Sequence, residues 1–173
     1  MAAKYYMALD DSPDHAAALG RLLGHWAILE TKLMHMMEIL LNVDHHRADF
    51  VYKEFVSISS KITLLKRLNR WLTKDESLKD EIKNLLSKAG KLNTQRNDFI
   101  HARWLSVAHG DYSNKLIRIS ISSPRDINEL HKPSKRFTAQ DIQDVVEEIV
   151  KLSLSFQKLL DRMLKEKLEQ APE

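Results

Sequence analysis

The sequence predicts a mainly all-α protein: an up-and-down bundle of about five helices with one small β-hairpin inserted near residues 104–122. Three observations support this fold class. The 173 residues include only four glycines and four prolines, which leaves few tight turns. Apolar residues recur at intervals of three and four over most of the chain, the spacing of helices that bury one face. Only one stretch shows the alternating pattern of strands.

Two helices are predicted in the first third of the chain. Ser12-Pro13-Asp14 combines a capping serine, a proline suited to the first helical position and an acid for the positive end of the helix dipole. This helix is expected to continue to about Asn42, and Asp44 is expected to cap a second helix over about 45–57. The apolar stripe of the first helix is expected to be Leu19, Leu23, Trp26, Leu33, Met37 and Leu40. The inward residues of the second helix are expected to be Phe50, Val51 and Phe55.

Two further helices and the hairpin follow. Ser59 and Ser60 precede a third helix, and a fourth is expected from near Asp75 to about Arg103. The apolar stripes are Ile62, Leu65, Leu68 and Leu72 in the third helix, and Leu78, Ile82, Leu85, Ala89 and Leu92 in the fourth. The hairpin is predicted because Leu105 and Val107, then Ile117, Ile119 and Ile121, alternate on either side of a turn cluster at 110–114.

A polar loop from Pro124 to Pro133 leads to the last long helix. Thr138 is expected to cap this helix, with Asp141 as a short-armed partner in a capping box. The buried stripe is predicted to be Ile142, Val145, Ile149, Leu152, Phe156, Leu159 and Met163.

Composition excludes several classes of protein. The chain contains no cysteine, which rules out disulfides, thiolate metal sites and cysteine nucleophiles and favours a cytoplasmic location. No signal-peptide pattern opens the chain and no apolar run approaches the length of a membrane span, so a membrane is not an expected partner. A single domain over 1–173 is predicted, with frayed ends at 1–11 and 170–173.

Charge is distributed unevenly along the chain. The net charge is only +3, but residues 61–103 carry eleven Lys or Arg against five acids. The flanks at 1–60 and 138–173 are each acidic. A basic middle of this kind fits a phosphate backbone, although a solvated lysine face would give the same composition.

Two charged residues are predicted within apolar stripes. Glu30 is in register with Trp26 and Leu33 on the first helix. Arg96 is in register with Leu92 and Phe99 on the fourth. Because a lone charge in a core costs several kcal/mol, Glu30 and Arg96 are predicted to pair across the two helices. The pair could serve only to set helix register, or it could support a site.

The neighbours of Arg96 favour a site. Asn93, Asn97 and His101 are spaced by four and are therefore expected on one helical face beside Arg96. A cation, a carboxamide and an imidazole together suit metal-free RNA cleavage: His101 moves a proton at the 2′-hydroxyl or the leaving oxygen, and Arg96 stabilises charge on the phosphorus oxygens. The alternatives are a capping histidine and an asparagine that ties helices together.

The segment Arg96-Asn97-Asp98-Phe99-Ile100-His101 resembles the Arg-x(4–6)-His signature of the HEPN superfamily, in the form with a polar residue after the arginine. The Trp26-to-Glu30 pattern, Ser60-Lys61-Ile62 to Leu65, and the Phe137-Thr138 start of the last helix also resemble members, over most of residues 15–165. This chain departs from the family in two places. Members often have a small residue or glycine just after the histidine, where this chain has Ala102-Arg103-Trp104, a difference that bears on access to the cleft, and Asp98 places an acid beside the motif.

The resemblance implies a homodimer in which two copies of the motif form a composite cleft. Active members are metal-independent endoribonucleases that leave 2′,3′-cyclic phosphate ends, in toxin–antitoxin, antiviral and RNA-processing systems. It implies that Arg96 and His101 are catalytic with Asn97, and that Glu30 and Asn93 support them. Lys91, Arg103 and Trp104 are predicted RNA contacts, and an antitoxin or regulatory protein is a possible partner. The alternative is a catalytically silent dimer that binds nucleotide, RNA or protein.

No metal or other cofactor is expected. His15, His25, His35 and His45 recur every ten residues. On a continuous helix this interval rotates each side chain by roughly 80°, so these histidines are not expected to converge. His45 and His46 are interpreted as a surface pair.

Overall fold

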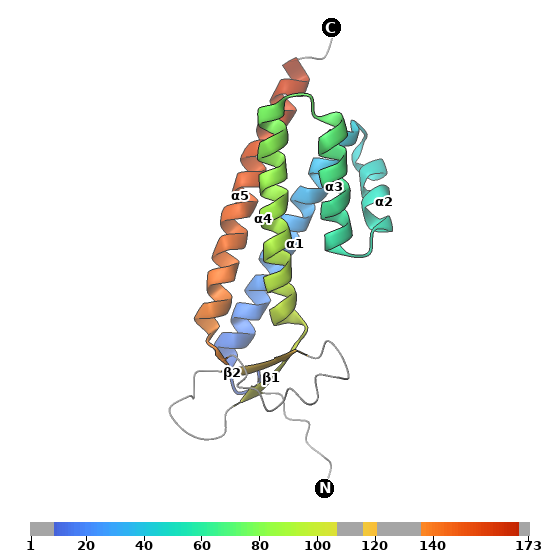
Figure 1. The fold of residues 1–173 in the computed structure, drawn as a ribbon. Coiled ribbons are helices and arrows are strands. Elements are labelled where there is room, and N and C mark those ends of the chain that lie inside the picture. Colours follow the sequence, from blue (N-terminus) through green and yellow to red (C-terminus); the bar gives the residue numbers. More distant parts are fainter. Residues whose placement is uncertain (1–8, 107–115, 121–135, 170–173) are drawn as a thin grey trace. The chain divides into compact units, whose positions relative to one another are not determined.

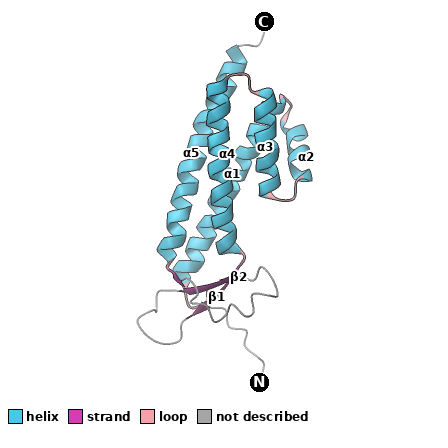
Figure 2. Cartoon of the chain, in the orientation of Figure 1, coloured by secondary structure: helices cyan, strands magenta, loops and turns pink. Residues whose placement is uncertain are grey.

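A computed structural model describes residues 9–106, 116–120 and 136–169 (Figure 1). Helix accounts for most of this part of the chain, and the predicted mainly all-α fold class with five helices is confirmed (Figure 2). No helix in these ranges is long and apolar enough to cross a membrane. The elements in order are α1 (Pro13–Leu41), α2 (His45–Glu54), α3 (Ile58–Leu72), α4 (Glu76–Ile100), β1 (Ala102–Ser106), β2 (Leu116–Ser120), β3 (Arg136–Phe137) and α5 (Ala139–Glu169).

The chain divides into two compact units. The first consists of residues up to Gly24 together with Thr94–Glu147, so it holds the start of α1, the end of α4, the three strands and the start of α5. The second consists of His25–Asn93 and Glu148–Glu173. Three helices, α1, α4 and α5, contribute residues to both units. The single domain over 1–173 stays a prediction.

The first unit contains the predicted hairpin. β1 pairs antiparallel with β2 in the register Ala102↔Ser120 to Ser106↔Leu116, and β2 pairs antiparallel with the short β3. The sheet order in the described residues is therefore β1-β2-β3. The expected turn at 110–114, the loop at 124–133, Val107 and Ile121 lie outside the described residues. So do 170–173 and, of the predicted frayed end at 1–11, residues 1–8, while residues 9–11 are described as a turn.

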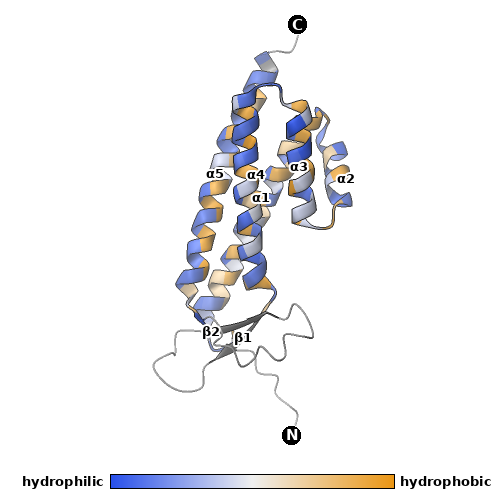
Figure 3. Ribbon diagram, viewed as in Figure 1, coloured by the Kyte–Doolittle hydropathy of each residue, from blue (hydrophilic) through white to orange (hydrophobic). Residues whose placement is uncertain are grey.

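The start of α5 confirms the predicted capping box. The Thr138 N–H donates to Asp141 Oδ2 over 2.6 Å, and the Asp141 N–H donates to Thr138 Oγ1 over 3.2 Å. Along α5 all seven residues of the predicted stripe, from Ile142 to Met163, are buried. Figure 3 shows apolar and polar residues interleaved along this helix, as expected when one face packs and the other is solvated.

In the second unit, α3 and α4 form an antiparallel hairpin joined by residues 73–75 (Figure 1). The buried Asn69 stabilises this turn, because its side-chain Nδ2 donates to the Lys79 backbone carbonyl over 2.8 Å and its backbone carbonyl accepts from the Thr73 N–H. Arg162 of α5 binds Glu81 of α4 in the same unit.

The buried stripe of α1 differs from the prediction in its first half. Ala18 and Leu22 are fully buried, whereas Leu19 is half-buried and Leu23 is 44% exposed. Two neighbouring apolar rows run along this part of α1, and spacing alone does not decide which one packs. In the second half Trp26, Leu33 and Met37 are buried as predicted, and Leu40 is half-buried.

Helix α2 is shorter than predicted and packs through a different face. Asp44 caps it as expected, accepting from the Arg47 N–H over 3.0 Å, but the helix ends at Glu54. Ala48 and Tyr52 are its buried residues, while Phe50 is 70% exposed. Two residues along a helix correspond to about 200° of rotation, so a helix that buries Ala48 turns Phe50 to solvent. Val51 and Phe55 are half-buried.

The bounds of α3 and α4 also differ from the prediction. Ser57 caps α3, which begins at Ile58, before the expected serine pair, and Leu72 at its end is 48% exposed. Helix α4 ends at Ile100, three residues earlier than predicted, because strand β1 begins at Ala102. Within these bounds the predicted inward residues Ile62, Leu65, Ile82, Leu85, Ala89 and Leu92 are buried, and Leu68 and Leu78 are half-buried.

Candidate functional site

The Arg96–His101 motif lies at the junction of helix and sheet in the first unit. Helix α4 ends at Ile100 and β1 begins at Ala102, so His101 alone joins the two elements. The His101 N–H still donates to the Asn97 carbonyl over 3.0 Å, which extends the helical hydrogen-bond pattern by one residue. The His101 side chain is exposed. An imidazole available for proton transfer is thus attached to a backbone that is held from both sides.

Asn97 contacts both other members of the motif. Nη1 of Arg96 donates to Oδ1 of Asn97 over 2.8 Å, and the Asn97 carbonyl accepts from the backbone of His101. The side chains of Arg96 and Asn97 are half-buried. A hydrogen bond to the carboxamide restricts the rotation of the guanidinium.

Four aromatic side chains hold this junction in place. The rings of Phe99 and Trp104 are nearly parallel, at 8° and 6.1 Å between centroids, and Phe137 packs edge-on against both, at 5.2 and 6.3 Å. The buried His15 of α1 completes the cluster, with its Nε2 3.1 Å from the Phe137 carbonyl oxygen. Sequence reasoning missed this cluster, whose only signal was the concentration of aromatic residues where helices meet strands.

Three predicted site residues, Glu30, Lys91 and Asn93, lie in the second unit. Asn93 is 4% exposed and its Nδ2 donates to Ser59 Oγ over 3.3 Å, so it ties α4 to α3. Lys91 is exposed. Exposure differs along the expected common face: Asn93 is buried, Asn97 is half-buried and His101 is exposed. The shared face of the three residues stays a prediction.

Trp104 and Arg103 are the remaining predicted RNA contacts. One face of the half-buried Trp104 indole packs on Phe99, which gives it a structural contact in addition to the predicted role. The side chain of Arg103 lies outside the described residues.

Glu30 is half-buried on α1 and lies close to Tyr52 of α2. The Tyr52 hydroxyl donates to the Glu30 carbonyl over 3.3 Å, and the ammonium of Lys61 lies 4.1 Å from the centre of the Tyr52 ring. Burial of the phenol, followed by the negative charge of Glu30, raises the pKa of Tyr52 well above its usual value. These contacts link α1 at Glu30 to α2, and α2 to α3.

Glu30 and Arg96 were expected to be buried in the core, but each is only half-buried. Glu30 belongs to the second unit and Arg96 to the first. Their pairing therefore stays a prediction.

Helix α3 carries an exposed aromatic residue among basic ones. Trp71 is 80% exposed. Three basic residues close to it in sequence are also exposed: Arg67, Arg70 and Lys74. Near the other end of α3 is a shallow hollow lined by Phe55, Ser59, Ser60, Thr63, Leu64 and Arg67. The basic middle of the sequence predicted the charges, but Trp71 was not singled out.

The structure also contradicts the expected separation of the histidines. His35, Glu38 and His45 come together, with their nitrogen and carboxylate oxygen atoms within 4.8 Å of one another. The expected rotation assumed one continuous helix, whereas α1 ends at Leu41 and the chain reverses before His45.

Comparison of the chain with protein-family models, with curated proteins and with solved structures finds no match.

Proposed function

We propose that this chain is a metal-independent endoribonuclease of the HEPN type, with Arg96 and His101 as catalytic residues and Asn97 as their positioning residue. The observation that carries the proposal is the double contact of Asn97, which binds the Arg96 guanidinium through its side chain and the His101 backbone through its carbonyl. A cation held by a neighbouring side chain and an exposed imidazole five residues further along the chain supply the two groups that RNA cleavage without metal requires.

The proposed reaction is an internal transfer within RNA. An imidazole accepts the proton of a 2′-hydroxyl, the 2′-oxygen attacks the adjacent phosphorus, and the bond to the 5′-oxygen breaks. The leaving oxygen takes a proton from a second imidazolium, so the products are a 2′,3′-cyclic phosphate and a 5′-hydroxyl. Arg96 stabilises the charge on the non-bridging oxygens. One chain has one His101, and a homodimer with a composite cleft would supply both the base and the acid.

Lys91, Arg103 and Trp104 are proposed to contact RNA, and a cytoplasmic location with an antitoxin or regulatory partner is part of the same proposal. Lysine and arginine neutralise phosphates, and an indole stacks on bases. The excess of basic residues over 61–103 supports this assignment.

The test is cleavage of end-labelled single-stranded and tRNA-like RNAs in EDTA. Wild type is compared with His101→Ala and with His46→Ala, a control that removes another exposed histidine. We expect wild type and His46→Ala to cut, leaving cyclic-phosphate ends, and His101→Ala to be inactive with an unchanged circular dichroism spectrum. Equal cutting by His101→Ala, or cutting that EDTA abolishes, would refute the proposed mechanism.

The exposed Trp71 favours a second candidate, the catalytically silent binding module. An exposed indole with three exposed basic residues near it in sequence, Arg67, Arg70 and Lys74, is a platform on which single-stranded RNA can stack. This candidate predicts no cleavage by any variant, and RNA affinity that falls with Trp71→Ala but not with His101→Ala.

A further inference from the structure

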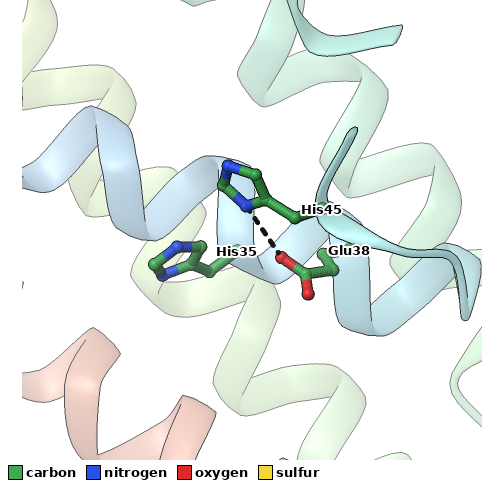
Figure 4. A group of neighbouring side chains, drawn as sticks. All are labelled: His35, Glu38 and His45. Atoms are coloured by element: carbon green, nitrogen blue, oxygen red, sulfur yellow. Dashed lines mark ion pairs between the residues drawn. The ribbon is translucent and has the colours of Figure 1, made fainter. Parts of the chain in front are cut away.

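We propose that His35, Glu38 and His45 form a binding site for a divalent transition metal ion such as Zn²⁺. The three side chains come from the end of α1 and from the first residue of α2 (Figure 4). All three lie in the second unit, and none is buried. The site is separate from the residues of the proposed nuclease reaction.

A defined turn brings the ligands together. His35 and Glu38 are three residues apart on α1 and therefore share one face. Asn42 adopts a left-handed conformation, with φ of 53°, at which the helix ends. The Asn42 N–H donates to the Ile39 carbonyl and the Val43 N–H to the Glu38 carbonyl, over 3.2 and 3.3 Å, a Schellman motif. This reversal returns His45 to the face that carries His35 and Glu38.

The distances fit a small ion. Nδ1 of His45 lies 3.5 Å from Oε2 of Glu38, and the rings of His35 and His45 are 6.0 Å apart between centroids. Two ligands on a tetrahedral Zn²⁺ with bonds of about 2.0–2.1 Å are separated by about 3.3 Å. The His45–Glu38 distance is close to this value. The distances from the His35 nitrogen to the other two ligand atoms are at most 4.8 Å, and small rotations of the side chains would shorten them to the same value. The Glu38 side chain is 33% exposed and that of His45 is 54% exposed, which leaves them accessible to an ion from solvent.

The donor set defines the class of ion. Two imidazoles and one carboxylate suit Zn²⁺, Co²⁺, Ni²⁺ and Cu²⁺, whereas Mg²⁺ and Ca²⁺ prefer oxygen ligands throughout. Three protein ligands leave one tetrahedral position for water. An ion bound here would cross-link α1 to α2 across the Asn42 turn and would stabilise the folded chain by binding only to it.

The experiment uses the full chain after removal of metal by a chelator. Titration with Zn²⁺ by calorimetry, and with Co²⁺ by visible absorption, measures stoichiometry and affinity, and thermal melts with and without Zn²⁺ measure the gain in stability. We expect one equivalent to bind and to raise the melting temperature. His35→Ala, Glu38→Gln and His45→Ala should each weaken binding by about tenfold or more, the least expected when a residue of a metal site is removed.

His46→Ala and His25→Ala are the matched controls, because each removes a histidine of the same unit outside the group. Both should bind as wild type does. The proposal is overturned if wild type binds no stoichiometric ion, if the three ligand variants bind as wild type does, or if His46→Ala loses binding as completely as His45→Ala, which would assign the ion to the adjacent pair. RNA cleavage measured in EDTA does not depend on whether this site binds a metal ion. The metal-site proposal can therefore be wrong while the proposed nuclease function is right, and the reverse.

Discussion

The carboxamide of Asn97 accepts a hydrogen bond of 2.8 Å from the guanidinium of its chain neighbour Arg96. Adjacent residues on a helix point about 100° apart, so the two side chains meet only because the long arginine turns toward the asparagine. The contact orients a half-buried charged group near the end of α4, and the asparagine adds no charge of its own.

Asn97→Ala should therefore lower the rate of RNA cleavage while leaving substrate affinity nearly unchanged. The expected loss is about 10–100-fold in single-turnover rate, because the guanidinium keeps its charge but loses its fixed direction. The stability cost should be about 1 kcal/mol, that of one side-chain hydrogen bond. An unchanged rate, or a loss confined to affinity, would show that Asn97 does not position Arg96.

Phe99→Ala should destabilise the first unit by about 3–5 kcal/mol, measured by denaturant unfolding. Phe99 is 5% exposed and packs on both Trp104 and Phe137, so truncation removes ring contacts and leaves a cavity. Phe50→Ala is the matched control: Phe50 is 70% exposed, and its truncation should change stability by no more than about 0.5 kcal/mol. Equal effects of the two variants would contradict the assignment of the aromatic cluster as the support of the junction.

Tyr52→Phe should reduce the sensitivity of the protein to alkaline pH. The folded state raises the pKa of Tyr52 above the value of about 10 that the unfolded chain has, through burial and the charge of Glu30. Below pH 10 the phenol is protonated in both states. Above it the unfolded chain releases the proton first, so the free energy of unfolding falls by up to about 1.4 kcal/mol per pH unit. The measurement compares denaturant unfolding of both proteins between pH 9 and the pH at which wild type unfolds. Parallel curves would be inconsistent with this shift.

A double-mutant cycle with Glu30→Gln and Arg96→Gln tests the pairing expected from the sequence. A fully buried pair would cost about 3–5 kcal/mol on loss of one partner. Because Glu30 and Arg96 are each half-buried, we expect a coupling free energy nearer 1 kcal/mol in unfolding experiments. Additive single effects would mean that the two residues do not interact.

Features that depend on neighbouring residues were predicted correctly from the sequence. The Thr138–Asp141 capping box, the Asp44 cap, the buried stripe of α5 and the presence of the hairpin all follow from patterns within a few residues. Local hydrogen bonds and a single clear apolar row determine such features, because no competing arrangement is available to them.

Tertiary structure decided what local patterns left open. It buried Ala18 and Leu22 rather than Leu19 and Leu23. It also left Phe50 exposed, buried Asn93 and left His101 exposed. It also ended α4 at Ile100, since residues from Ala102 pair in a sheet. The convergence of His35, Glu38 and His45 depends on the left-handed Asn42 turn, which helical periodicity cannot predict. The sequence by itself thus determined which segments are helices and located the caps of α2 and α5, whereas the α3 cap at Ser57 was not predicted. Which faces pack, and which side chains distant in sequence meet, depends on burying the most apolar surface over the whole chain at once.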